Sequence, residues 1–267
     1  MNFILFAPTF FAGPPLGYKN FLSFRSMPSS KRPEIFKFIL LLISFELYQH
    51  FFPVMNFSHE TSLIKVELIT LFHLVFIWYK FLIIWRFHRA WAQLYGIDVI
   101  DNMSRCIMNN YCFEGFWRMW HRGFNQWLIR YLYIPLGGNK SLFSVVIAVV
   151  FVAFWHDHTL NIVVLALGII LCILPEILIK RYVNKHYSHL FREHWFKYLC
   201  AFMASIYIFC LVLINIAGFG YGAEKIGLVW DKMKQEWAEL ILSIYIITGT
   251  VMLMFYKRTL EGQKINY

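Results

Sequence analysis

Six long apolar stretches, separated by polar segments, set the pattern of this chain. They cover residues 36–52, 63–85, 142–155, 160–179, 198–219 and 240–256. A helix that crosses a bilayer needs about 20 mostly apolar residues, and most of the six stretches approach that length. The pattern therefore predicts an all-α fold, a polytopic bundle of about six transmembrane helices with additional re-entrant segments.

The first 18 residues are predicted to form a partial or re-entrant segment. Residues 1–11 are apolar but lack the basic region with which a signal peptide begins. The run then meets Ala12-Gly13-Pro14-Pro15, and proline breaks a helix.

The composition supports a membrane location. Of the 267 residues 59% are hydrophobic and 15% are charged, against about 25% charged in an average soluble domain. The net charge of +10 raises the alternative of nucleic-acid binding. The basic residues lie between apolar spans and form no continuous stripe, so we expect membrane lipids as partners and no nucleic acid.

The charges of the connecting segments alternate along the chain. Lys and Arg dominate residues 19–37, 86–141, 180–197 and the tail after 256, but not residues 53–62, 156–159 or 220–239. The positive-inside rule assigns basic segments to the cytosol. This predicts a multi-pass protein with a cytosolic C-terminus and a cytosolic-side region at 86–141.

The third apolar stretch is short and ends at an ionisable tripeptide. Residues 142–155 would form a helix of about 21 Å, whereas the hydrocarbon layer is about 30 Å thick. His156-Asp157-His158 would then lie at membrane depth, where ionisable residues are costly and usually functional. A neutral imidazole there could act as a general base.

Two other interpretations of this tripeptide remain open. It could be a solvated turn on the lumenal side, or it could hold zinc. Histidines at positions i and i+2 are poorly placed on one helix face and no third ligand is evident, so we expect no metal. The five cysteines match no common metal motif and imply no disulfide framework.

A second group of candidate functional residues precedes residues 142–155 in the sequence. Arg118, Arg122 and Arg130 could clamp phosphates, because a guanidinium is a planar fork of donors. Gly137-Gly138 could bring backbone N–H groups close to an anion. The alternative is an aromatic and basic helix that contacts lipid headgroups.

Three motifs in this order resemble those of the membrane-bound O-acyltransferases. They are Phe116-Trp117-Arg118-x-Trp120-His121, then Trp127-x-x-Arg130-Tyr131-x-Tyr133-Ile134-Pro135-Leu136-Gly137-Gly138, and finally Trp155-His156-Asp157. Within the family the chain is most similar to the Gup1-type glycerol uptake proteins, a branch related to Hedgehog acyltransferase. Smaller matches, among them Asn102-Met103 and Leu174-Pro175-Glu176, extend the resemblance over residues 5–180.

The resemblance implies one family-type domain over residues 1–267, with a tunnel that fatty acyl-CoA enters from the cytosol. It implies that His156, in the helix pair 142–179, is catalytic and that His121 is a second functional site. Further residues then become candidates for binding acyl-CoA or the acceptor: Trp117, Arg118, Trp120, Arg122, Asn125, Arg130, Tyr133, Trp155 and Asp157. The acceptor would be a lipid or a lipidated protein, as in remodelling of glycosylphosphatidylinositol anchors in the endoplasmic reticulum, and no cofactor beyond the acyl-CoA substrate is implied.

The chain also departs from the family pattern. Family members are usually longer at the N-terminal end, so we expect this chain to correspond to the C-terminal part of a full member. Gly123 stands where a hydroxyl residue is common, and Phe124 where Tyr is common. A glycerol or polyol transporter and a non-catalytic family member are the alternative functions.

Overall fold

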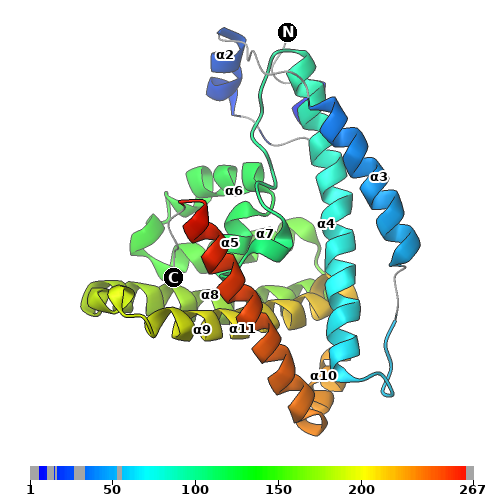
Figure 1. Cartoon of the computed structure of the whole chain (residues 1–267). Helices are drawn as coiled ribbons and strands as arrows, with labels where there is room; N and C mark the ends of the chain where they lie inside the picture. The colour runs from blue at the N-terminus through cyan, green and yellow to red at the C-terminus, as the bar shows by residue number, and fades with distance from the viewer. Residues whose placement is uncertain (1–5, 11–14, 16, 27–33, 53–55, 263–267) are drawn as a thin grey trace. The chain divides into compact units, whose positions relative to one another are not determined.

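The computed structural model describes residues 6–10, 15, 17–26, 34–52 and 56–262, and this part consists of helices joined by loops, with no strand. The α-helices are α1 (Ala7–Phe10), α2 (Tyr18–Ser26), α3 (Ile35–Phe51), α4 (Leu63–Leu94), α5 (Phe113–Met119), α6 (Arg122–Leu128), α7 (Leu142–His156), α8 (Leu160–His186), α9 (Phe196–Asn215), α10 (Lys225–Gln235) and α11 (Trp237–Leu260) (Figure 1). Five short helical turns complete this part: η1 (Ile107–Asn109), η2 (Ile129–Tyr133), η3 (Gly138–Lys140), η4 (Ser188–Arg192) and η5 (Ile216–Gly220).

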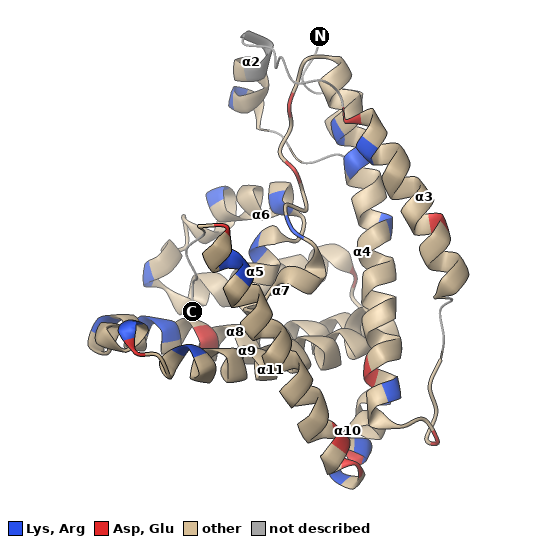
Figure 2. Cartoon of the chain, in the orientation of Figure 1, with Lys and Arg blue, Asp and Glu red and all other residues tan. Residues whose placement is uncertain are grey.

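All six predicted apolar stretches form helices. Four helical stretches are long and apolar enough to cross a bilayer: α4, α8, α11, and α9 together with η5. Even α11, with 24 residues, reaches about 36 Å. Figure 2 shows α9 and α11 free of charge over most of their length, with charged residues gathered toward the helix ends. These observations confirm an all-α, multi-pass membrane protein.

The count of six spans stays a prediction. The helix α3 has 17 residues and α7 has 15, which is shorter than the usual span. For α7 the structure agrees with the short third stretch expected from the sequence, because the helix ends at His156.

Two segments differ from the sequence prediction. The second apolar stretch was expected to end at Trp85, but α4 continues for nine more residues to Leu94. Within residues 86–141, expected to be a long connection, the helices α5 and α6 form. At the N-terminus α1 occupies Ala7–Phe10, whereas the predicted helix break at residues 12–15 lies outside the described residues except for Pro15.

The chain divides into two compact units that interleave along the sequence. Unit 1 comprises Met1–Val54, Leu74–Ile107 and Trp117–Ser144; unit 2 comprises Met55–His73, Met108–Phe116 and Val145–Tyr267. The chain passes between the units after Val54 and within α4, η1, α5 and α7. The prediction of one domain over residues 1–267 stays a prediction.

Aromatic pairs hold the helices of unit 1 together. Figure 1 shows α3 beside the later part of α4, and Phe45 of α3 stacks on Phe76 of α4 with ring centroids 5.7 Å apart. Further along, Leu82 and Trp85 of α4 are buried with Met103 of the following loop. The second half of α4 therefore packs against both α3 and the loop that follows α4.

Small residues allow the helices of unit 2 to approach closely. Ala201 and Ala204 of α9 are buried with Val251 of α11, where α9 and α11 pack along each other. Such close packing is typical of membrane helices. Gly218 of η5 lies so close to Leu165 of α8 that an added Cβ would be 2.8 Å from that side chain. Only glycine permits this approach of η5 to α8.

Candidate active site

His156 is the last residue of α7, in unit 2, and its side chain is exposed. Its ring contacts Trp155 edge to face, with centroids 4.8 Å apart, and Phe219 of η5 at 5.5 Å. No hydrogen bond to the His156 ring occurs within the described residues. Both ring nitrogens are therefore left without a hydrogen-bond partner among the described residues.

Asp157 does not act on His156 in this structure. Its Oδ1 accepts the backbone N–H of His158 at 2.6 Å, while the His158 ring lies 5.5 Å from that of Phe154. Neighbouring residues on a helix point in different directions, so this arrangement follows from the local geometry. The carboxylate shapes the turn into α8, which begins at Leu160.

His121, in unit 1, has an unusual backbone. It precedes α6 with φ 47° and ψ 53°, and within the described residues every other positive φ belongs to glycine. A non-glycine residue in this left-handed region is strained by about 1 kcal/mol or more. Such strain persists only where the surroundings enforce it.

Aromatic rings enclose the His121 side chain. The imidazole stacks on Trp85 with centroids 5.0 Å apart and an interplanar angle of 24°. On Phe124 it stacks at 5.3 Å and 25°. Trp120 meets Trp85 edge to face at 5.9 Å, so it supports one wall of this enclosure. Two of the predicted site residues, His121 and Trp120, are thus brought together around Trp85, which the sequence did not single out.

The other predicted residues of the motif region lie on several short elements. Trp117 and Arg118 belong to α5, and the Arg118 carbonyl accepts a long hydrogen bond of 3.4 Å from Asn125 of α6. Tyr133 in η2 donates to Asn139 Oδ1 at 3.0 Å.

The three arginines of the expected phosphate clamp are distributed over three elements. Arg118 lies in α5, Arg122 begins α6, and Arg130 belongs to η2. A joint phosphate site therefore stays a prediction. Gly137 and Gly138 have φ of 105° and 52°, which explains why glycine occupies both positions.

Sequence reasoning included Glu176 in a family match but assigned it no role; it is 3% exposed in α8. Its Oε2 accepts the backbone N–H groups of Phe113 at 2.9 Å and Glu114 at 3.2 Å, at the start of α5. Lys180 pairs with its other oxygen at 2.9 Å. The sequence could have indicated this role, because a Glu four residues before a Lys can form an ion pair on a helix, and charged residues in an otherwise apolar helix usually have a function.

The charge pattern assigned Arg86 and Arg89 only to the basic segment 86–141 on the cytosolic side. Both arginines form an ion network with Glu34, Asp98 and Asp101: Arg86 reaches Glu34 at 2.9 Å and Asp101 at 2.7 Å, and Arg89 reaches Asp98 at 3.1 Å. With Lys37, whose Nζ lies 3.0 Å from Glu34 Oε1, three cations face three carboxylates there. These ion pairs stabilise the part of α4 that extends beyond Trp85.

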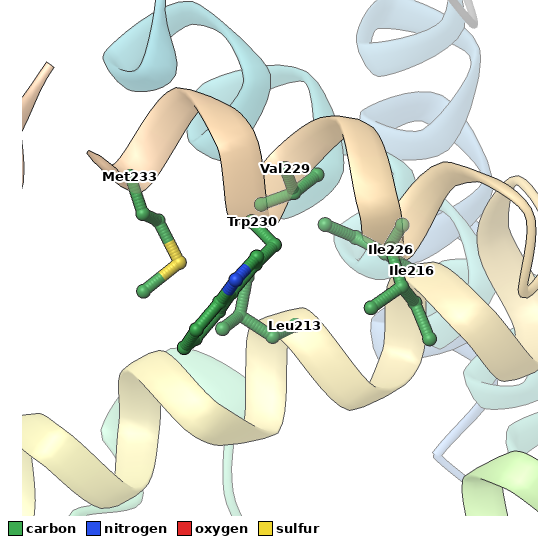
Figure 3. Close-up of a pocket in the computed structure, with 6 residues that line it drawn as sticks. All are labelled: Leu213, Ile216, Ile226, Val229, Trp230 and Met233. Carbon is green, nitrogen blue, oxygen red and sulfur yellow. The ribbon is translucent and has the colours of Figure 1, made fainter. Parts of the chain in front are cut away.

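The hollow drawn in Figure 3 lies between α9, η5 and α10, and has a volume of about 40 Å³. Its walls are Leu213, Ile216, Ile226, Val229, Trp230 and Met233. Ligand sites usually measure about 300 Å³ or more. The hollow is thus smaller than a usual ligand site, and the six residues that line it carry no ionisable side chain. No cluster of His, Cys, Asp or Glu that could hold a metal occurs in the described part of the chain.

The chain matches the model of the membrane-bound O-acyltransferase family over residues 1–222. It belongs to this family. Membrane-bound O-acyltransferase GUP1 of Saccharomyces cerevisiae is 37% identical over 234 residues, which are 83% of this chain and 41% of that protein. Membrane-bound O-acyltransferase gup1 of Schizosaccharomyces pombe is 33% identical over 238 residues, 85% of this chain and 40% of that protein.

A shorter match is to mouse protein-cysteine N-palmitoyltransferase HHAT, which is 31% identical over 93 residues, 33% of this chain and 18% of that protein. The chain spans about two fifths of the length of the two GUP1 relatives above. The expected family and its Gup1-type branch are therefore confirmed. Both candidate histidines lie within the matched residues 1–222.

Proposed function

We propose that this chain carries the acyl-transfer site of a membrane enzyme that moves a fatty acyl group from acyl-CoA to an acceptor hydroxyl or amine. The observation that carries the proposal is the exposed His156 at the end of the short apolar helix α7, with both ring nitrogens open. Membership of the membrane-bound O-acyltransferases supports it.

In the proposed reaction His156 acts as general base. It takes the proton from the acceptor hydroxyl while the oxygen attacks the thioester carbonyl carbon. The C–S bond then breaks, CoA leaves as a thiolate, and the proton passes from the imidazolium to that sulfur. His156 is thereby returned to its neutral form and the acceptor has become an ester.

His121 has a separate proposed role, which is to orient the acceptor or to stabilise the oxyanion. Its enclosure by Trp85 and Phe124 fixes the plane of its ring, and fixed donors are more effective in this role than mobile ones. Arg118, Arg122 and Arg130 remain candidates for the CoA phosphates.

The finer proposal concerns the acceptor and the compartment. Similarity to the Gup1-type branch favours a lipid acceptor, as in anchor remodelling in the endoplasmic reticulum, with the C-terminal tail of this multi-pass protein in the cytosol. The shorter similarity to a protein-cysteine N-palmitoyltransferase keeps a protein acceptor as the competing possibility.

The first prediction tests the general base. Membranes that contain the protein are supplied with palmitoyl-CoA labelled with ¹³C in the acyl chain, and labelled lipids and proteins are identified by mass spectrometry. We expect His156→Ala to lower label transfer by about 100-fold or more, because the base is lost. His158→Ala is the matched control, two residues away, and should retain transfer.

Full label transfer by His156→Ala would contradict the role of this residue. If the wild type took up labelled glycerol but transferred no acyl label, the transporter alternative would replace the proposed function.

A further inference from the structure

A buried asparagine, Asn102, accepts two hydrogen bonds from the start of α6, directly after His121. Asn102 is 1% exposed, and its Oδ1 accepts the backbone N–H of Gly123 at 2.8 Å. Its backbone carbonyl accepts the N–H of Arg122 at 3.2 Å. The first N–H groups of a helix have no partner within the helix. Asn102, which lies in a loop distant in sequence, therefore supplies the acceptors for the first two backbone N–H groups of α6.

These two bonds determine the conformation of His121. The ψ angle of a residue sets the direction of the next residue's N–H group. With the Arg122 N–H bound to Asn102, the ψ of His121 is fixed at 53°. The strained left-handed backbone is thus imposed by Asn102, and it directs the imidazole between Trp85 and Phe124.

Glycine at position 123 allows Asn102 to approach the backbone of α6 this closely. A Cβ at that position would lie 2.9 Å from Asn102 Oδ1 and 2.9 Å from Cδ of Pro15. Contacts this short force neighbouring atoms to move. The departure from the family pattern at Gly123 thereby acquires a physical reason, since no side chain fits between α6 and Asn102.

Asn102 is itself anchored to the helix that bears Trp85. The preceding residue, Asp101, binds Arg86 of α4 at 2.7 Å and accepts the N–H of Met103 at 3.2 Å. The Met103 side chain is buried against Trp85. Helix α4 therefore holds both the ring on which His121 stacks and the loop that fixes its backbone.

The geometry points to Asn102 as a positioning residue for His121 in the acyl-transfer reaction. This inference rests on the proposed function, because it assumes that His121 acts on the substrate. Asn102 touches no reacting atom in this scheme and acts only through the backbone of residues 121–123. The expected consequence is a loss of turnover with little change in donor binding.

The test compares Asn102→Ala with two other variants. Asn102→Asp keeps an oxygen acceptor for the Gly123 N–H, and Asn102 Nδ2 makes no hydrogen bond within the described residues that the change would remove. Gln93→Ala is the matched control: Gln93 is also a buried amide of unit 1, and its Oε1 accepts the Glu34 N–H at 3.0 Å. All three variants are measured in membranes with palmitoyl-CoA as donor.

The activity measurement separates kcat from KM. We expect Asn102→Ala to lower kcat for label transfer by about 10- to 100-fold with KM for palmitoyl-CoA changed by less than about twofold, because a misplaced group lowers turnover. Asn102→Asp should keep most of the activity, and Gln93→Ala should keep kcat. Unchanged kcat in Asn102→Ala, or an equal loss in Asn102→Asp, would overturn the inference.

A second measurement is independent of activity. Hydrogen exchange of the peptide that covers residues 120–128, followed by mass spectrometry, reports on the Arg122 and Gly123 amides. Asn102→Ala should raise their exchange rate by on the order of tenfold, whereas Asn102→Asp and Gln93→Ala should not. Unaltered exchange in Asn102→Ala would overturn the positioning role even if transfer fell. If Asn102→Ala raised the exchange rate but the wild type showed no transfer activity, the failure would lie in the proposed function and not in the contact between Asn102 and α6.

Discussion

At the scale of single residues, the two candidate histidines have different surroundings: His156 is exposed at the end of α7, whereas His121 has a left-handed backbone and stacks between Trp85 and Phe124. His156 could be found because an ionisable tripeptide follows an apolar run, and the structure places it at a helix end. The left-handed backbone of His121 could not be predicted, because it depends on Asn102, about twenty positions earlier in the sequence. The roles of both histidines remain predictions of the sequence and the family resemblance.

Glu176 yields a prediction at the same scale. Glu176→Ala removes the acceptor of two backbone N–H groups at the start of α5 and leaves Lys180 without its carboxylate partner. We expect a loss of stability on the order of 2 kcal/mol, measured as a lower thermal transition of the protein in detergent.

The matched control is Glu193→Ala, since Glu193 is an exposed residue of the same type. The free energy of unfolding of Glu193→Ala should stay within about 0.5 kcal/mol of that of the wild type. Equal losses in both variants would refute the structural role of Glu176.

At the scale of helices, the apolar pattern predicted the type of each element better than its ends. Helix α4 extends to Leu94 because Arg86 and Arg89 find carboxylate partners, and those partners come from residues far away in sequence. Likewise α5 and α6 are seven residues each, too short for a periodic signal to stand out. The close approach of η5 to α8 could not be predicted either, because it arises from tertiary packing between segments that are far apart in sequence.

That approach can be tested at Gly218. Gly218→Ala would place a Cβ 2.8 Å from Leu165, so we expect overpacking that destabilises the protein by about 1–3 kcal/mol. Because Phe219 is the next residue and contacts His156, label transfer should fall as well.

The control for this change is Gly249→Ala in α11, where an added Cβ meets nothing within 4 Å. Alanine there should leave stability unchanged or raise it by up to about 1 kcal/mol. Thermal stability of the two variants, measured side by side, checks the prediction, and a Gly218→Ala protein as stable as Gly249→Ala would disprove it.

At the scale of the whole molecule, composition and charge pattern predicted a multi-pass helical membrane protein, and the four long apolar helices confirm it. The interleaving of two units could not be predicted, because it arises from contacts between distant segments. Orientation in the membrane, deduced from alternating basic segments, is a prediction that a labelling experiment can address.

The ion network of unit 1 makes its stability depend on pH. Burial raises the pKa of Glu34, but the hydrogen bond from Lys37 and the charges of Arg89 and Arg86 outweigh it, so the pKa lies below its ordinary value of 4.5. A lowered native pKa stabilises the fold fully above 4.5, and this contribution is lost as the pH falls through the native pKa.

Unfolding in detergent, followed as a function of pH, tests this dependence. The stability of the wild type should fall below pH 4.5 more steeply than that of Glu34→Gln, which cannot titrate at this position. Parallel pH profiles of the two proteins would show that Glu34 is not a source of the acid sensitivity.

The shortness of α7 has a consequence for the lipid around it. Its 15 residues extend about 22 Å, whereas the hydrocarbon layer is about 30 Å thick. A mismatch of this kind is relieved where the bilayer thins or its flanking polar residues reach toward the headgroups. If α7 enters the bilayer as the sequence predicts, the end that bears His156 would lie beneath a locally thinned leaflet. In the proposed reaction, the thickness of the host bilayer, and hence its sterol and acyl-chain content, would then set how readily the acyl donor reaches the imidazole.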